Sequence, residues 1–338
     1  MNPIVSLQQI AAHAGVSKGT VSLALRNNPR ISAETRALVR ASAEALGYRP
    51  NPAVAAWMAH RRRLCPQTGG ESLAFINSWL VRNEWAAAPW FTRFVDGARV
   101  RATALGFGFE EYWLAECGMT PVRMEKILRA RGVRGMLIGS LPVNACQIKF
   151  GWANFAAVAQ GHSLAEPELS RSVCDYAHAM QLALCKLGEL GYQRIGYISA
   201  ANLEARTQRL NLSAYLGYQA TITAGDRIPI LEWVKQSPKE LGAWVRQVKP
   251  DAIVSHDLKI QDLLREIGVR IPQDIGVAAL CLHPDSPPLL AGIDQCLERC
   301  GEVAVDLLVS HLHHNEVGPP SQPIIALTRG VWKAGETV

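Results

Sequence analysis

Two short helices at the start of the chain, separated by a tight turn, constrain the fold more than any other sequence feature. Ser6 and Ser17 are helix-capping residues, and apolar residues follow each of them at helical spacing. Gly15, between them, allows the left-handed backbone that ends a helix. The pattern predicts helices over 6–14 and 18–25 joined by about three residues, which is helix-turn-helix geometry.

A third helix completes this small unit. Ser32 caps it, Glu34 lies in its first turn and Gly47 ends it. The residues expected on its core face are Leu38, Val39, Ala43 and Leu46. Any three-helix bundle would show the same periodicity, so the periodicity alone does not assign a function to the unit.

The positive charge of the chain is concentrated in this segment. Up to Arg63 there are nine basic and two acidic residues, a local charge of +7, whereas the other 275 residues have 26 basic and 27 acidic ones. Hydroxyl residues also gather at the helix starts, where backbone N–H groups can hold phosphates. The sequence therefore predicts that the N-terminal segment, and not the rest of the chain, binds a polyanion.

Composition excludes several other classes of protein. With 49% hydrophobic and 19% charged residues, the chain is neither disordered nor a coiled coil. No stretch approaches the roughly 18 apolar residues of a membrane span, and no apolar signal segment begins the chain. The eight cysteines lack CxxC spacing, which is typical of reduced, buried thiols. We therefore expect a cytoplasmic protein without membrane attachment.

Residues 6–51, SLQQIAAHAGVSKGTVSLALRNNPRISAETRALVRASAEALGYRPN, closely resemble the DNA-binding headpiece of the LacI/GalR (lactose-repressor) family of bacterial transcriptional regulators. The resemblance lies in the patterns I-A-x-x-A-G-V-S-x-x-T-V-S, S-x-x-T-R and L-G-Y-x-P-N. It implies that 1–50 is a headpiece whose helix from Ser17 to Leu25 enters the major groove of an operator.

In that family the start and outer face of the second helix read bases, which here nominates Lys18, Gly19 and Leu23. Gly19 has no side chain and Leu23 offers only apolar contact, so Lys18 becomes the main candidate donor, with a phosphate contact as the alternative. Arg26 and Arg30 are expected to clamp phosphates, or else to be solvated. The hydroxyls expected at phosphates belong to Ser6, Ser17, Thr20, Ser22 and Thr35.

Residues 51–63 are predicted to be a hinge helix, and 64–72 a linker. The hinge is about three turns long, which is marginal for an isolated helix. In the resembled family it folds on the operator and inserts a leucine into the minor groove. Trp57 occupies that position here, and it either unstacks a base step or packs against protein. The other hinge residues expected at the DNA are Asn51, Val54 and Met58.

From residue 73 onward, apolar strands alternate with amphipathic helices, which predicts an α/β core with parallel sheets buried on both faces. The expected strands are 73–77, 107–113, 135–139, 155–160, 194–199, 252–255 and 277–282. The expected helices include 91–105, 121–131, 175–190 and 258–267.

This core, 73–338, resembles the periplasmic-binding-protein-like (type I) core of the same family, through P-D-A-I-V at 250–254 and G-V-R-I-P-Q-D-I at 268–275. The resemblance implies effector binding, dimerisation and two doubly wound parallel-sheet subdomains. We expect one subdomain over about 73–160 plus 296–318, and the other over about 161–293 plus 322–338.

Such a core binds a small molecule, by resemblance a sugar or sugar derivative, at the carboxyl ends of its strands. The candidate liners are Trp79, Ser140, Gln160, Asp175, Arg209, His256, Asp257, His283 and Gln295. Asp257 and Arg209 are the first choices, with Arg206 as an alternative to Arg209. Each candidate also has a structural interpretation: Trp79 as interface packing, Asp175 as a helix cap and His256 as a core or loop histidine.

The sequence argues against three other functions. Residues 161–165, GHSLA, resemble a hydrolase nucleophile elbow at Ser163, but Ala165 replaces its second glycine and Pro167 disfavours a following helix. Cys296 and Cys300 lie too far along one helix from the histidines at 311, 313 and 314 to share a metal. A stand-alone solute-binding protein would leave the first 63 residues unexplained.

We therefore expect a repressor rather than an enzyme, with no metal or cofactor. By resemblance it acts as a homodimer on a near-palindromic double-stranded DNA operator of the bacterial nucleoid.

Overall fold

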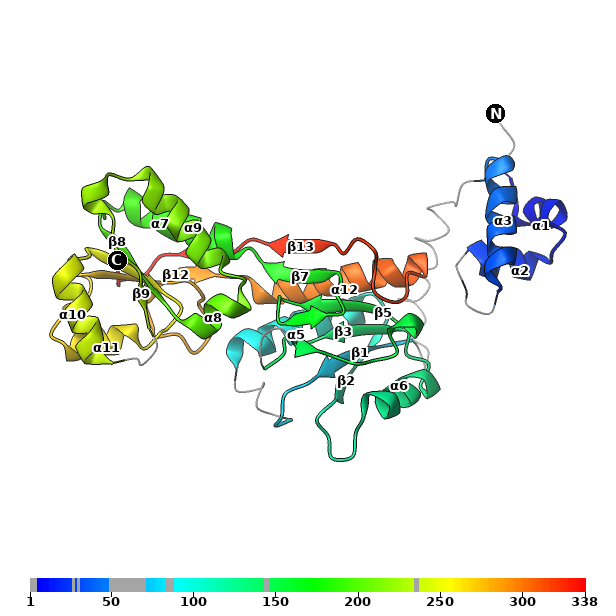
Figure 1. The fold of residues 1–338 in the computed structure, drawn as a ribbon, viewed down its shortest axis with the longest axis horizontal. Coiled ribbons are helices and arrows are strands. Elements are labelled where there is room, and N and C mark those ends of the chain that lie inside the picture. The colour runs from blue at the N-terminus through cyan, green and yellow to red at the C-terminus, as the bar shows by residue number, and fades with distance from the viewer. Residues whose placement is uncertain are drawn as a thin grey trace.

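The protein was analysed as a computed structural model that describes residues 5–25, 28, 31–48, 71–82, 88–142, 146–233 and 237–338. In these ranges the chain forms a three-helix headpiece and two α/β subdomains with one six-stranded sheet each (Figure 1). The fold class predicted from the sequence is confirmed. No helix in the described ranges is both long and apolar enough to cross a membrane.

The headpiece consists of α1 (Leu7–Ala14), α2 (Lys18–Leu25) and α3 (Ala33–Ala45). Ser6 and Gln9 form the predicted capping box: the Gln9 N–H donates to Ser6 Oγ over 3.4 Å, and the Ser6 N–H donates to Gln9 Oε1 over 2.7 Å. Gly15 has a φ of 64° and ends α1, so only three residues separate α1 from α2. This confirms the helix-turn-helix geometry.

The core of the headpiece is small. Ile10, Val21, Ala24 and Val39 are fully buried in it. Leu38, which the sequence placed in this core, is 51% exposed. Neighbouring residues of a helix point about 100° apart, so α3 cannot bury both Leu38 and Val39 on one narrow face.

The first subdomain is built on a parallel sheet in the order β13-β7-β5-β3-β1-β2. Its strands are β1 (Ser72–Asn77), β2 (Gly108–Trp113), β3 (Gly135–Ile138), β5 (Ala156–Gln160), β7 (Arg171–Cys174) and β13 (Ile325–Thr328). Its helices are α5 (Pro89–Ala104), α6 (Pro121–Ala130) and α12 (Leu297–His314). A short 3-10 turn, Trp152–Asn154, precedes β5, and β4 (Cys146–Gln147) pairs with β6 (Leu164–Glu166) outside the main sheet.

The second subdomain has the strand order β14-β12-β11-β10-β8-β9, with β14 antiparallel to β12. Its strands are β8 (Ile195–Ser199), β9 (Leu231–Glu232), β10 (Ala252–Ser255), β11 (Gly276–Ala279), β12 (Ala291–Asp294) and β14 (Val331–Lys333). Its helices are α7 (Tyr176–Glu189), α8 (Ala201–Arg206), α9 (Leu210–Thr221), α10 (Pro238–Val248) and α11 (Ile260–Glu266), with a 3-10 turn at Ala224–Asp226.

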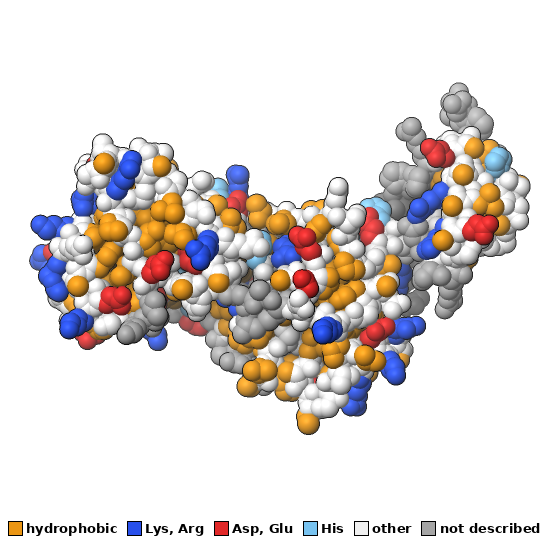
Figure 2. Space-filling view, in the orientation of Figure 1, with side chains coloured by type: hydrophobic (Ala, Val, Ile, Leu, Met, Phe, Trp, Pro, Cys, Tyr) orange, Lys and Arg blue, Asp and Glu red, His pale blue; other side chains and the backbone are white. Residues whose placement is uncertain are grey.

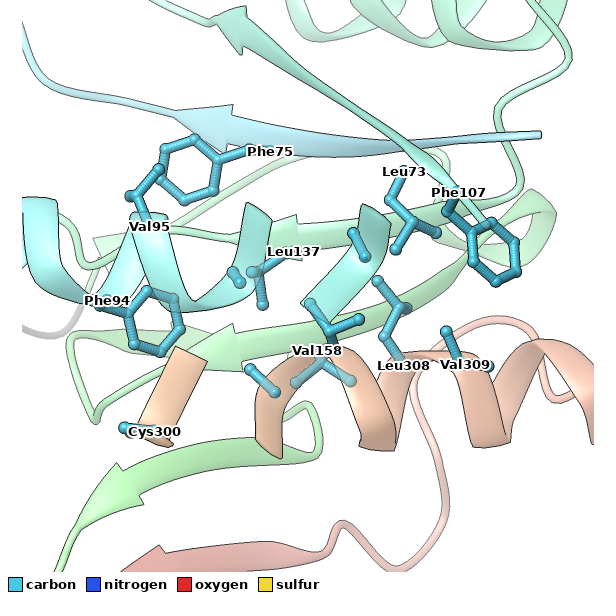
Figure 3. Packing of buried hydrophobic residues seen from close by; sticks show 14 of the residues in the cluster. Leu73, Phe75, Phe94, Val95, Phe107, Leu137, Val158, Cys300, Leu308 and Val309 are labelled. Carbon is cyan, nitrogen blue, oxygen red and sulfur yellow. The ribbon is translucent and has the colours of Figure 1, made fainter. Parts of the chain in front are cut away.

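Both sheets are buried on two faces, because alternate residues of a strand point to opposite sides. In β1, Leu73 and Phe75 pack against α5 and α12, whereas Ala74 and Ile76 pack toward α6. Figure 3 shows the first of these layers, with Val158 and Leu308 meeting between β5 and α12.

Helices α5 and α12 cross at two glycines. A Cβ at Gly97 would lie 2.0 Å from the Glu298 carbonyl oxygen, and one at Gly301 would lie 2.0 Å from the Phe94 carbonyl oxygen. No side chain fits at either position, so the two backbones pack directly against each other. This contact fixes the start of α12 against α5.

The chain passes between the subdomains three times: after β7, after β12 and between β13 and β14. The expected boundaries placed 171–174 and 325–328 in the second subdomain, but β7 and β13 belong to the first sheet. The reason is long-range pairing, since β7 hydrogen-bonds to β5 and β13 to β7. The connections therefore lie near residues 175, 295 and 329.

Candidate DNA-binding face and ligand cavity

The outer face of α2 presents the three residues that the sequence nominated to read bases. Lys18 and Gly19 are exposed in its first turn, and Leu23 is 36% exposed one turn later. Val21 and Ala24 are buried on the opposite side. A Cβ at Gly19 would meet only Ser17 Oγ at 3.6 Å, so packing does not require a glycine there.

Four of the five nominated hydroxyl groups lie in the first turn of a helix or at its cap. Ser17 Oγ accepts the Thr20 N–H at 3.0 Å and lies 2.8 Å from Thr20 Oγ1. Ser32 Oγ forms the same pair of contacts with Thr35, at 3.2 and 2.8 Å. Ser6 is exposed at the start of α1 and Ser22 is half-buried on α2. Six other nominated residues lie outside the described ranges: Arg26, Arg30, Asn51, Val54, Trp57 and Met58.

Charged side chains of both signs are interspersed over the core, without one dominant patch on the face shown in Figure 2. This agrees with the near-neutral charge counted for residues beyond 63. On this face the core therefore presents no dominant positive surface that would compete with the headpiece for a polyanion.

A cavity of about 240 Å³ lies between the two subdomains. Five of the nine nominated residues line it: Ser140, Gln160, His256, His283 and Gln295. Arg206, the alternative to Arg209, also lines it. Further lining residues that the sequence did not nominate for the effector include Trp90, His162, Ser163, Ser172, Cys174, Tyr176, Thr207, Cys281 and Cys300. Trp90 had a weak sequence signal, since it follows Pro89 directly before an expected helix.

The wall from the first subdomain is a connected hydrogen-bond network. Gln160 Oε1 accepts the Ser140 N–H at 3.1 Å, and Ser163 Oγ accepts the Leu141 N–H at 2.8 Å. Trp79 supports this wall from behind, since its Nε1–H donates to the Ser140 carbonyl oxygen at 2.9 Å. Trp79 itself does not line the cavity; its ring packs on Trp90, which does, with 6.3 Å between ring centroids.

Arg206 crosses the cavity from the second subdomain. Its guanidinium donates to Ser140 Oγ at 2.6 Å and to the carbonyl oxygens of Leu141 and Pro142 at 2.8 and 3.2 Å. Its Cζ lies 5.6 Å from the centroid of the Trp90 ring, within reach of a cation–π contact. Arg209, which the sequence ranked first, is exposed and does not line the cavity.

The break between α8 and α9 explains this difference. Arg206 is the last residue of α8, whereas Arg209 has a φ of 58° at the start of α9. The left-handed backbone turns the chain, so the two arginines point in unrelated directions.

The two nominated carboxylates also lie outside the cavity lining. Asp175 caps α7, because its Oδ1 accepts the His178 N–H at 3.0 Å. Asp257 Oδ1 accepts the Lys259 N–H at 2.9 Å just before α11. Both carboxylates bind local backbone, and for Asp175 this is the helix cap that the sequence offered as its structural interpretation. The described lining residues accordingly include no Asp or Glu.

Three histidines give the cavity neutral hydrogen-bonding groups. Burial, with a smaller effect of Arg171, lowers the pKa of His162 to about 4, and burial alone lowers the pKa of His256 to about 4. Burial also lowers the pKa of His283. Each neutral ring has one donor and one acceptor nitrogen. Within the described ranges, both ring nitrogens of His162, Nε2 of His256 and Nδ1 of His283 are buried without a hydrogen-bond partner.

A second side-chain contact between the subdomains lies beside the cavity. Arg93 of α5 forms ion pairs with Asp294 at 3.0 Å and with Glu298 at 2.6 Å, and it donates to the Leu282 carbonyl oxygen at 3.2 Å. Asp294 ends β12 in the second subdomain, so this cluster spans the connection that leads into α12.

The catalytic alternative at Ser163 is contradicted. Strand β6 follows this serine where a nucleophile elbow needs a helix, and Ser163 Oγ is bound to the backbone of Leu141. In the described ranges, no three His, Cys, Asp or Glu side chains converge as metal ligands would.

Comparison with known proteins matches both parts of the chain. Residues 6–51 match the model of bacterial regulatory proteins of the lacI family, and residues 186–332 match a periplasmic binding protein-like domain. The HTH-type transcriptional regulator PtxS of Pseudomonas plecoglossicida is 27% identical over 93% of this chain and 91% of its own. The lactose operon repressor of Escherichia coli K12 is 26% identical over 90% of this chain and 84% of its own.

Solved structures share the fold. The lac repressor dimer bound to operator and the anti-inducer ONPF superposes with a TM-score of 0.57 at 22% identity, covering 99% of both chains. The complex of the transcriptional regulator CelR with cellobiose superposes with a TM-score of 0.55 at 21% identity, covering 99% of this chain and 100% of that one.

Proposed function

Because the chain is a DNA-binding transcriptional regulator of the lacI family and not an enzyme, we propose that it is a repressor controlled by a sugar or sugar derivative. In this proposal a homodimer binds a near-palindromic operator on the bacterial nucleoid. The effector binds in the cavity between the two core subdomains. The headpiece (1–50) binds DNA, and the hinge (51–63) folds when DNA is bound. The linker (64–72) joins the hinge to the core (73–338), which binds the effector.

The observation that carries the proposal is the composition of the cavity wall. Neutral imidazoles, amides and hydroxyls surround it, and each can donate to or accept from a sugar hydroxyl. Trp90 offers an aromatic ring beside them, and the CelR relative was solved with cellobiose bound. At about 240 Å³ the cavity lies below the roughly 300–1,000 Å³ of drug-sized sites, which favours a small effector.

Regulation follows from linkage between effector and operator. An effector that changes the contacts of Arg206 and Arg93 changes the spacing of the subdomains, and with it the separation of the two hinges in the dimer. An inducer disfavours the paired hinge helices, and a corepressor favours them. Effector and operator must then alter each other's affinity by the same factor.

Two observations support the proposed dimer and its binding to an operator. The lac repressor relative was solved as a dimer bound to operator, and the exposed face of α2 offers Lys18 and Leu23 to a groove. With Gly19 between them, this face is poor in donors, so operator choice also depends on DNA shape and on the hinge residue Trp57.

The test begins with the full-length protein and a thermal-shift screen of monosaccharides, sugar derivatives and nucleobases. Duplexes selected from a random pool then supply the operator for fluorescence anisotropy with and without each hit. We expect a sugar hit that raises the Tm and changes operator affinity about fivefold or more. A hit that raises the Tm without changing operator affinity would contradict allosteric control, and failure to select any duplex would contradict the DNA-binding role.

A further inference from the structure

We propose that the effector is a sugar acid whose carboxylate binds at the side of the cavity formed by Arg206, Ser140 and Ser163. This inference rests on the proposed function, because it names the chemical class of the effector for the same cavity. Neutral sugars of the same size then bind more weakly.

The charged residues of the cavity wall have one sign. Among the described lining residues, Arg206 is the only arginine, lysine, aspartate or glutamate. The three lining histidines add donors and acceptors but no charge at neutral pH, because burial lowers the pKa of each. A carboxylate in the wall would accept hydrogen bonds from the hydroxyls of a neutral sugar but would repel an anion. The described wall is therefore suited to a ligand with a negative charge.

A second cation lies behind the wall. Arg171 is only 5% exposed, and its guanidinium donates to the carbonyl oxygens of Leu169, Gly161 and Leu164 at 3.3 Å each. All three of these partners are neutral, whereas Glu168 attracts Arg171 by charge alone and is exposed to water. Water screens Glu168 more than it screens the buried guanidinium. Because Gly161 lines the cavity, the positive charge of Arg171 acts on a ligand there.

The other charged cluster at the cavity has the opposite balance. Arg93 is flanked by Asp294 and Glu298, two carboxylates for one guanidinium. It binds the carbonyl oxygen of Leu282, which lies between two lining residues in the chain. An anionic group is not attracted to this part of the wall. The charge distribution therefore favours the side of Arg206 for the carboxylate.

Hydrogen-bond donors gather on that side. Arg206 donates to Ser140 Oγ at 2.6 Å, and Ser163 Oγ accepts the Leu141 N–H at 2.8 Å. Each hydroxyl thus accepts one hydrogen bond and keeps its own proton to donate, and the two oxygens lie 3.4 Å apart. His162, next to Ser163 in the chain, lines the same cavity, and neither of its ring nitrogens has a partner within the described ranges. A carboxylate accepts through both oxygens, and its charge strengthens these hydrogen bonds.

Charge and size favour a carboxylate over a phosphate ester. A phosphate monoester carries a charge of about −2 at neutral pH, whereas the described wall offers one guanidinium. The cavity of about 240 Å³ is small, which favours a single sugar unit over an oligosaccharide. The hydroxyls of such a molecule are left for the neutral imidazoles of His256 and His283.

The test compares ligands that differ in the carboxylate alone. Full-length protein is titrated in a calorimeter, at matched ionic strength, with gluconate against glucitol, galactonate against galactitol and glucuronate against glucose. Glucose 6-phosphate is the phosphate arm. We expect at least one acid to bind about tenfold or more tightly than its neutral counterpart, and glucose 6-phosphate to bind more weakly than that acid.

Variants separate the charge from the shape of the wall. Arg206→Gln should lower the affinity for the acid about tenfold, and Arg206→Lys, which keeps the charge, should lower it less. Arg171→Gln removes the charge behind the wall and should lower the affinity about threefold. Arg209→Gln, at an exposed position, is the control and should leave the affinity unchanged. If the buried variant Arg171→Gln fails to fold, the ligand comparison and the Arg206 variants decide.

Two results would overturn the proposal. In one, an alditol or neutral sugar binds as tightly as its acid, which leaves the proposed sugar-controlled repressor intact. In the other, glucose 6-phosphate binds and no acid does, so that the anion is a phosphate. If no ligand of the panel binds, sugar control fails together with this inference, and that pattern differs from both of the others.

Discussion

The Arg206 guanidinium donates a 2.6 Å hydrogen bond to the Ser140 hydroxyl, and so a side chain of the second subdomain reaches across the cavity to the first. The same guanidinium binds the carbonyl oxygens of Leu141 and Pro142. A ligand between the subdomains must lie beside these contacts or replace them. Arg206 therefore connects the occupancy of the cavity with the spacing of the subdomains.

The first prediction concerns this bridge. Arg206→Ala should weaken effector binding roughly tenfold, or about 1.5 kcal/mol, because hydrogen bonds to a charged group are lost. Arg206→Lys should keep only part of the wild-type affinity for the effector, because a lysine ammonium lacks the planar guanidinium that reaches three oxygens. Calorimetry with the effector measures both.

The matched control is Arg209→Ala, because Arg209 is exposed and three residues away in sequence. Its effector affinity should stay within about twofold of the wild type. Equal losses for the two variants would contradict the assignment of Arg206 and support the original ranking from the sequence.

The second prediction concerns the crossing of α5 and α12. Gly301→Ala should destabilise the first subdomain by about 3 kcal/mol or more, because its Cβ would lie 2.0 Å from the Phe94 carbonyl oxygen and the backbones would have to separate. Gly188→Ala, on the exposed side of α7 with no atom within 4 Å of the new Cβ, should instead be neutral or slightly stabilising. Urea unfolding of the two variants compares them directly; a Gly301→Ala protein as stable as the wild type would disprove the close crossing.

The third prediction concerns pH. The pKa of His256 falls from the ordinary 6.5 to about 4 in the folded protein, so below pH 6.5 the unfolded chain binds a proton that the folded chain does not. Stability from this group is present above that pH and is lost as the pH falls toward 4. Between pH 7 and pH 5 the loss should reach about 2 kcal/mol.

His256→Gln should reduce this pH dependence, and urea unfolding at both pH values measures it. His314→Gln, at an exposed position near the end of α12, serves as the control and should leave the profile unchanged. A His256→Gln protein with the full wild-type pH dependence would show that other groups cause the loss.

The fourth prediction concerns the DNA-binding face. Lys18→Ala should reduce the discrimination between operator variants by about 1–3 kcal/mol at the base that Lys18 contacts. Competition binding of single-base operator variants measures this. Arg30→Ala, at the proposed phosphate clamp, should weaken all sequences alike and reduce the salt slope by about 1. If Lys18→Ala lowers the affinity for all operator variants equally, Lys18 contacts a phosphate and not a base.

Much of the headpiece could be predicted because its signals are local. Ser6, Gly15 and Ser17 act on backbone groups within one helical turn, so their spacing alone predicts both helices and the turn. All seven strands expected in the core are also present, and most of them are compact apolar runs, although 107–113 contains two glutamates.

The sequence did not predict the short strands that mix polar and apolar residues. Arg171 and Ser172 begin β7 and are buried, although polar side chains in a short run give no strand signal. Their burial depends on partners far away in sequence: Arg171 pairs with Ile325 of β13, and Ser172 pairs with Gln160 of β5. The subdomain boundary was misplaced for the same reason.

The sequence by itself determined the helix-turn-helix unit, its positive charge and the α/β class of the core, because caps, periodicity and charge act over a few residues. Only the tertiary structure decided which side chains surround the cavity. Arg206 and Arg209 are the same residue type and lie three positions apart. The helix nevertheless breaks between α8 and α9, where Gln208 and Arg209 have positive φ, so that Arg206 lines the cavity and Arg209 is exposed to solvent. Likewise Ser140 and His256, which lie in different subdomains, line one cavity only because the two subdomains pack together, and such long-range geometry leaves no local pattern in the sequence.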